Sequence, residues 1–168
     1  QIVTPKEIHD LEPNIKPIYH GGVYYQHGRH ARNPKKILLK LFALFLKKGG
    51  KFLKMNIKDI NFDEEKPVIK AENKSFLFDK IVIACGSFSK KLTDNLDEKI
   101  PLDTERGYHV HFKDCDHLLS RPVIFQNRGF GITPMEQGLR VVGTVEFGGL
   151  DNPLSKSRVK NLINNAKY

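Results

Sequence analysis

Small side chains end an apolar run over residues 78–89, which read FDKIVIACGSFS. Ala84, Cys85, Gly86 and Ser87 leave the backbone open to a ligand, because their side chains are small or absent. A helix from Ser87 to Asn95 would also attract an anion to its N-terminus. The residues therefore predict either a phosphate or dinucleotide corner or an ordinary strand-to-helix turn.

A second set of candidate residues lies on two predicted strands of the C-terminal half. Strand alternation places four side chains on one face: Arg140, Val142, Thr144 and Glu146. Tyr108, in the stretch TERGYHV, offers a hydroxyl that can hydrogen-bond a carboxylate. The simpler interpretations, an exposed glutamate at a strand end and a half-buried tyrosine, stay open.

Histidine and cysteine residues near position 110 are spaced in a way that could mimic a zinc site. His109 and His111 share a strand face, and Cys115 and Asp116 follow them. A second matching pair of ligands is missing from this spacing, so we predict no metal. Cys85 and Cys115 are the only cysteines, which is too few for a disulfide framework and suits a reducing compartment.

Caps and periodicity predict the helices that position these residues. Residues 4–7 read as a capping box that opens a short helix, which closes at Glu12. Asn33 before Pro34 begins a helix with apolar residues at steps of three and four, and the glycines at 49–50 end it.

Four short β-prone runs follow this helix, at residues 51–60, 66–72, 74–79 and 80–85. The last run, KIVIAC, is apolar throughout and predicts a strand buried on both faces in an α/β arrangement. From residue 100 the pattern changes to turn-separated strands, which predict a largely antiparallel sheet before a last helix capped near Ser155. We therefore expect a fold of α/β and α+β character in two structural units.

The composition limits the classes of function. The chain has 168 residues, 39% hydrophobic and 28% charged, which suffices for one core or two small ones. The lysines behind the net charge of +9 are scattered, and no aromatic and basic platform accompanies them, so we expect no nucleic-acid partner. The most apolar segment, residues 37–46, is too short for a transmembrane helix and contains Lys40. We expect a cytoplasmic protein, with peripheral attachment to the inner membrane left open.

Several motifs together, in one collinear order, resemble a known family. They are GGVYYQHGRHARNP at 21–34, the helix after it, FDKIVIACGSFSKKL at 78–92, PLDTERGYHVHF at 101–112, and GFGITPMEQGLRVVGTVEFGGLD at 129–151. The chain resembles the FAD-dependent D-amino acid oxidase superfamily from about Leu11 to Leu154. The segments ERGYH and GTVEFGGLD are most similar to its bacterial D-amino acid dehydrogenase branch.

This resemblance implies two interleaved domains and FAD as cofactor. Residues 1–32 and 98–168 would belong to a substrate domain built on a mixed, largely antiparallel sheet with flanking helices. Residues 33–97 would belong to a Rossmann-type FAD domain. The backbone of Ala84, Cys85 and Gly86 would run alongside the FAD, and Ser87 would also contact the cofactor. Cys85 stands where the family has threonine. Ile57 would meet the adenine through its backbone.

The resemblance also implies that family motifs lie outside this chain. No GxGxxG stretch follows a first strand, and the C-terminal segment that carries the arginine for the substrate carboxylate is not seen. We therefore expect an internal fragment that binds FAD poorly by itself and is inactive.

The family chemistry implied is oxidation of D-amino acids to imino acids by hydride transfer from Cα to FAD. By resemblance, Thr144 and Glu146 would lie on the substrate side, with Tyr108 and Phe130 completing the pocket. The electron acceptor would be oxygen or a quinone. Two alternatives stay open: a glycine or sarcosine oxidase-like enzyme acting on small amines, and a non-catalytic small-molecule binding module of the same fold.

Overall fold

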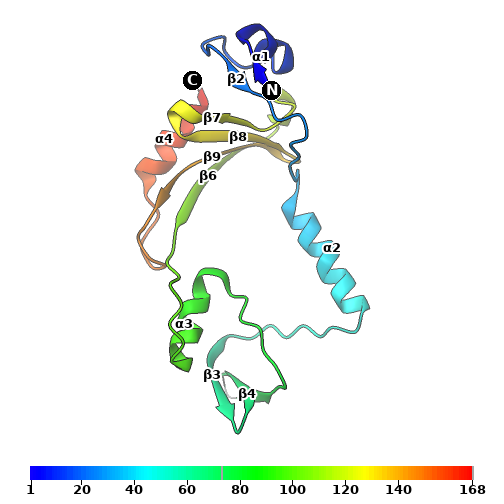
Figure 1. Cartoon of the computed structure of the whole chain (residues 1–168), viewed down its shortest axis with the longest axis vertical. Helices are drawn as coiled ribbons and strands as arrows, with labels where there is room; N and C mark the ends of the chain where they lie inside the picture. Colours follow the sequence, from blue (N-terminus) through cyan, green and yellow to red (C-terminus); the bar gives the residue numbers. More distant parts are fainter. Residues whose placement is uncertain (73, 168) are drawn as a thin grey trace. The chain divides into compact units, whose positions relative to one another are not determined.

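The computed structural model describes residues 1–72 and 74–167, and the chain forms two compact units (Figure 1). The first unit contains Gln1–Ala43, Arg106–Glu146 and Pro153–Tyr168, and the second contains Leu44–Glu105 and Phe147–Asn152. Each unit thus combines segments that are distant in the sequence. One boundary between the units falls inside a helix, at residues 43–44. The FAD domain expected at residues 33–97 stays a prediction.

A four-stranded antiparallel sheet is the centre of the first unit. Its order is β6 (Arg106–Phe112), β9 (Gly138–Glu146), β8 (Phe130–Met135) and β7 (Val123–Phe125). The antiparallel sheet predicted for the C-terminal half is therefore confirmed. Helix α4 (Lys156–Lys167) packs along one face of the sheet (Figure 1). The buried core between them consists of Tyr108, Phe130, Val141 and Leu162.

The N-terminal segment adds a small antiparallel pair and two helices. Strands β1 (Ile2–Val3) and β2 (Gly22–Val23) flank α1 (Pro5–Leu11), whose predicted capping box is confirmed by reciprocal bonds between Thr4 and Glu7. Helix α2 (Pro34–Lys47) begins where the Asn33 side chain accepts the Lys36 amide and ends before Gly49, which has a φ of 89°. Both helices were predicted from these residues.

The second unit contains an antiparallel meander of β3 (Ile57–Asp63), β4 (Lys66–Ala71) and β5 (Lys74–Leu77). The helix predicted from Ser87 to Asn95 is present as three short segments, η1 (Gly86–Phe88), α3 (Ser89–Thr93) and η2 (Asp94–Leu96). All the strand pairings of the described chain are antiparallel. The coarse prediction of antiparallel sheets with helices is thus confirmed.

The predicted strand KIVIAC is wrong for this chain. Residues 81–85 form no strand, and Val82 is 90% exposed. A strand buried on both faces requires neighbours at its edges and cover on both sides. The meander β3–β4–β5 does not pair with this run anywhere in the described part of the chain. An apolar run alone therefore did not suffice to place a strand here.

Candidate functional site

A β-bulge at Thr144 determines which side chains of β9 face helix α4. Gly143 pairs with Tyr108 and Val145 pairs with Gly107, so Thr144 is an extra residue, and its φ is 61°. An extra residue reverses the alternation of the side chains that follow it. The prediction that Arg140, Val142, Thr144 and Glu146 share one face is therefore wrong. Glu146 lies on the α4 face with its strand partner Arg106.

A polar cluster forms around Glu146 on this face. The Tyr108 hydroxyl donates to Glu146 Oε2 at 2.5 Å and accepts the Ser155 amide at 3.0 Å. The Arg106 guanidinium lies 3.7 Å from the same carboxylate oxygen and donates to the Pro153 carbonyl at 3.2 Å. Tyr108 is 5% exposed, so its hydroxyl reaches this cluster from the core. The bonds hold one carboxylate in a defined position at the end of the sheet.

An open pocket of about 530 Å³ lies beside the cluster. Thr144 and Glu146 line it together with Arg128, Arg158 and Asn161. The Arg158 guanidinium also donates a hydrogen bond to the Thr144 hydroxyl. A carboxylate and guanidinium groups in one pocket can bind the ammonium and carboxylate of a zwitterion by charge-assisted hydrogen bonds.

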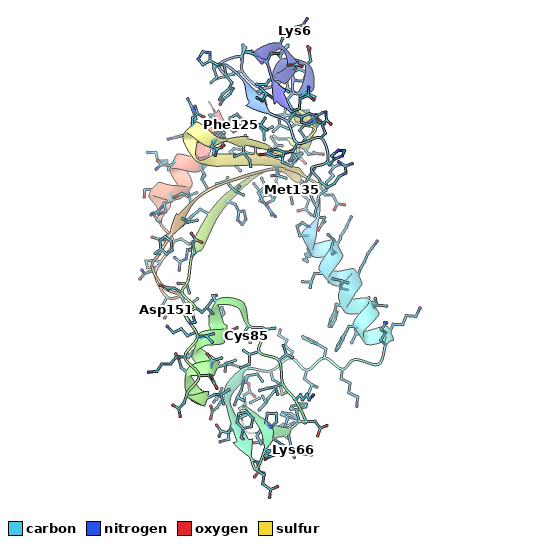
Figure 2. The ribbon with its side chains drawn as sticks, viewed as in Figure 1. Lys6, Lys66, Cys85, Phe125, Met135 and Asp151 are labelled. Carbon is cyan, nitrogen blue, oxygen red and sulfur yellow. The ribbon has the colours of Figure 1, made fainter. Side chains whose placement is uncertain are left out.

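The four predicted substrate residues have three different placements. Thr144 and Glu146 line the pocket. Tyr108 is buried in the core, and its hydroxyl donates to Glu146. Phe130 is 5% exposed and stacks on Phe125 with ring centroids 4.6 Å apart; Phe125 is labelled on β7 in Figure 2. Phe130 therefore belongs to the hydrophobic core and does not line the pocket.

The sequence analysis missed three arginines at this site, namely Arg106, Arg128 and Arg158. Arg158 lies in the first turn of α4, close after the predicted cap near Ser155. The sequence therefore predicted that Arg158 is at the start of this helix. The sequence did not predict the contact of Arg158 with Thr144, because that contact depends on how α4 packs across the strands.

The corner at residues 84–87 belongs to the second unit, and Figure 2 labels Cys85 there. Ala84, Cys85, Gly86 and Ser87 are all exposed, and a Cβ built on Gly86 would meet no atom within 4 Å. The Cys85 amide donates to the Ser89 hydroxyl at 3.1 Å. Ile57 is half-buried at the start of β3, where it pairs with Ala71. An exposed backbone with small side chains fits the close approach of a large planar or phosphate-bearing cofactor.

Two features were not found among the described residues. Among residues 1–72 and 74–167, no three or more His, Cys, Asp or Glu side chains are grouped so that they could hold a metal ion. No helix in these ranges is both long and apolar enough to span a bilayer.

Tyr108→Phe is expected to destabilise the first unit by about 1–3 kcal/mol, because Glu146 loses a buried donor and the Ser155 amide loses its acceptor. The measurement is the free energy of urea unfolding followed by circular dichroism. Tyr19→Phe is the control, because the ring of Tyr19 packs on Phe125 at 5.4 Å and its hydroxyl has no hydrogen bond within the described chain. Equal effects of the two substitutions would contradict the role of the Tyr108 hydroxyl.

The chain is similar to known proteins in both sequence and fold. All 168 residues match the family described as DAO, FAD dependent oxidoreductase. A D-amino-acid oxidase of Bradyrhizobium diazoefficiens is 29% identical over 146 residues, which are 86% of this chain and 35% of that protein. The chain thus spans about a third of the length of this relative.

Two solved structures share the fold. A glycine oxidase of Geobacillus kaustophilus superposes with a TM-score of 0.83 at 21% identity, covering 99% of this chain and 45% of that one. A glycine oxidase of Bacillus cereus gives 0.79 at 22% identity, covering 99% and 46%. The family match over all 168 residues establishes that the chain belongs to the DAO family of FAD-dependent oxidoreductases.

Proposed function

We propose that the chain is part of a flavoenzyme that oxidises D-amino acids to imino acids. The observation that carries this proposal is the family match over residues 1–168, supported by the similarity to a D-amino-acid oxidase. In the proposed reaction the substrate Cα–H bond breaks, a C=N bond forms, and the nitrogen loses a proton. FAD, when bound, accepts the hydride from Cα.

The cofactor contacts proposed for this chain are backbone contacts at Ile57, Ala84, Cys85, Gly86 and Ser87. The support is the exposed corner, where no side chain fills the space in front of Gly86. Cys85 offers a free, exposed thiol in place of a hydroxyl. This turn would therefore contribute to FAD binding through its shape and its backbone polar groups.

The substrate contacts proposed for this chain lie at the pocket beside Glu146. The Glu146 carboxylate would accept a substrate ammonium, and Arg158 would face the substrate carboxylate across Thr144. Tyr108 and Arg106 would act as positioning residues, because both hold Glu146. Phe130 would support the floor of the pocket from the core.

A glycine oxidase-like activity on small amines is the second candidate. Its support is the likeness in fold to two glycine oxidases, with TM-scores of 0.83 and 0.79. Oxygen and a quinone both remain candidate electron acceptors. The proposed pocket residues would bind an ammonium and a carboxylate, and both D-amino acids and glycine carry these two groups.

The test uses the complete gene product and its visible absorbance as purified. Anaerobic mixing with D-amino acids, their L-enantiomers, glycine and sarcosine is expected to bleach the oxidised flavin band with D-amino acids only. Bleaching by glycine and sarcosine would favour the second candidate. A protein that stays colourless after reconstitution with FAD would contradict both and favour a binding module. Re-oxidation by oxygen or by a soluble quinone then identifies the acceptor.

Glu146→Gln tests the pocket within the same enzyme. Loss of the carboxylate is expected to raise KM for a D-amino acid by roughly tenfold, since charge-assisted hydrogen bonds are worth more than neutral ones. Glu136→Gln is the matched control, because Glu136 binds Asn33 and Lys36 at the β8–β9 turn, outside the pocket. An unchanged KM in Glu146→Gln would exclude this pocket as the substrate site.

A further inference from the structure

The pocket beside Glu146 is bordered by hydrogen-bond donors from both α4 and β9. Side chains spaced three and four residues apart share one face of a helix. A polar stripe of this kind on α4 lines the pocket: Arg158, Asn161 and Asn165. Thr144 lines it from β9. A ligand in this pocket can therefore receive hydrogen bonds from two different elements.

Arg158 is the charged member of this stripe. It is half-buried and donates to the Thr144 hydroxyl. Among residues 1–72 and 74–167, no carboxylate lies within ion-pair distance of it. A guanidinium group carries further N–H donors, which can form paired hydrogen bonds to two oxygens of a phosphate. The Thr144 hydroxyl accepts from Arg158, so its own O–H is still a donor for the same ligand.

The amide groups of Asn161 and Asn165 extend the set of donors. Neither side chain forms a hydrogen bond within the part of the chain that the structure describes. Asn165 is half-buried, and an amide that loses water without gaining a partner costs free energy. A polar ligand in the pocket would supply that partner.

The charges around the pocket favour an anion. Arg128, at the end of η4 (Gln126–Arg128), lines it together with Arg158 and Glu146. The Glu146 carboxylate already accepts the Tyr108 hydroxyl at 2.5 Å and lies 3.7 Å from the Arg106 guanidinium. The three arginines outnumber this carboxylate, so the local charge attracts a negative ligand.

A phosphate group matches this arrangement better than a carboxylate. The oxygens of phosphate point in different directions around a tetrahedral centre, and each is a strong acceptor. One phosphate can therefore accept hydrogen bonds from Arg158 and Thr144 and from the asparagine amides at the same time. The two oxygens of a carboxylate lie in one plane and satisfy fewer of these donors.

We propose that the pocket beside Glu146 binds a phosphate group, with Arg158 as its charged anchor. The other donors are the Thr144 hydroxyl and the amides of Asn161 and Asn165. Phosphate binding does not depend on the flavin reaction. Arg158 and Thr144 also belong to the proposed substrate contacts, so competition between phosphate and the amino acid rests on the proposed function.

The experiment is calorimetric titration of the complete gene product at constant ionic strength. The ligands are inorganic phosphate, methyl phosphate and, as the carboxylate for comparison, acetate. Acetate is expected to bind at least roughly tenfold more weakly than phosphate, because it leaves donors of the pocket unbonded. Tighter binding of methyl phosphate would assign the site to a phosphate monoester, and tighter binding of inorganic phosphate to the free ion. Equal affinities for phosphate and acetate would overturn the proposal, as would no binding of either phosphate compound.

Two pairs of substitutions on α4 locate the bound phosphate. Arg158→Gln is expected to weaken phosphate binding roughly tenfold or more. Lys160→Gln is the matched control, because it removes the same charge from an exposed position of α4 outside the pocket. Asn165→Ala should weaken binding, whereas Asn164→Ala, at an exposed position outside the pocket, should not. Equal losses in Arg158→Gln and Lys160→Gln would show a diffuse attraction to the positive chain and would overturn the proposal.

Glu146→Gln distinguishes this proposal from the proposed function. The substitution is expected to raise KM for a D-amino acid and to strengthen phosphate binding, because it removes a negative charge from the pocket. An unchanged KM with tighter phosphate binding would contradict the substrate site and support the phosphate site. A raised KM in a protein that binds no phosphate would support the substrate site and overturn the phosphate site.

Discussion

Gly138→Ala is expected to unfold the four-stranded sheet of the first unit. Gly138 begins β9 directly after the turn from β8, with a φ of 125°, which L-residues rarely adopt. A Cβ there would lie 2.0 Å from the Phe112 carbonyl oxygen and 2.9 Å from the Lys113 Cα. These atoms belong to the backbone at the end of the neighbouring strand, so no side-chain rotation relieves the overlap. We expect a loss of at least about 4 kcal/mol, a large share of the stability of an ordinary domain.

Urea unfolding followed by circular dichroism measures this loss. Gly131→Ala is the matched control on the adjacent strand β8, because its new Cβ would meet its nearest neighbour at 3.4 Å and its φ lies outside the left-handed region. That substitution is expected to change stability by less than about 1 kcal/mol. A Gly138→Ala protein with the wild-type midpoint would show that the hairpin can shift to accept a side chain.

Local signals predicted much of this fold. The capping box at Thr4, the cap at Asn33 and the glycine at Gly49 act within one helical turn, so the sequence alone defines the ends of α1 and α2. The β-strands of the C-terminal half were predicted because each alternates its residues between turn-forming segments. These features depend on neighbours only a few residues away.

The features that the sequence did not predict depend on distant partners. An apolar run at 81–85 becomes a strand only if another strand pairs with it, and none does so among the described residues. The bulge at Thr144 follows from the register of β9 on β6, which brings together residues about 38 positions apart, such as Tyr108 and Glu146. The bond between Arg140 and His111 depends on that register as well.

The bulge has a direct consequence for the candidate site. Uninterrupted alternation would place Glu146 on the sheet face opposite α4, the face on which Arg140 lies. With Thr144 inserted, Glu146 instead meets Tyr108 and Arg106 on the α4 face. One extra residue therefore decides on which side of the sheet the Glu146 carboxylate lies and gives it Tyr108 and Arg106 as partners.

Glu12→Ala is expected to separate the end of α1 from the bend at residues 120–121. Glu12 is 4% exposed, and its carboxylate accepts the Ser120 amide at 3.0 Å, the Ser120 hydroxyl, and Arg121 Nε at 2.9 Å. Alanine removes the carboxylate that accepts these hydrogen bonds. Among the donors, the Ser120 amide is the most costly to leave unbonded. Because Arg121 is 34% exposed and water can solvate it, we expect a loss of about 2–4 kcal/mol, near the lower end for a broken buried pair.

Two further variants in the same segment serve as the control and as an intermediate case. Asp10→Ala removes an exposed carboxylate from α1 itself and should change the unfolding free energy by less than about 0.5 kcal/mol. Glu12→Gln keeps one acceptor oxygen but turns an amide group toward the donors, so its unfolding free energy should lie between those of wild type and Glu12→Ala. Limited proteolysis should also cleave residues 13–20 faster in Glu12→Ala than in Asp10→Ala, because this buried carboxylate anchors that end of α1 to residues 120–121. Equal cleavage rates and equal stabilities would show that other contacts of the N-terminal segment suffice to hold it.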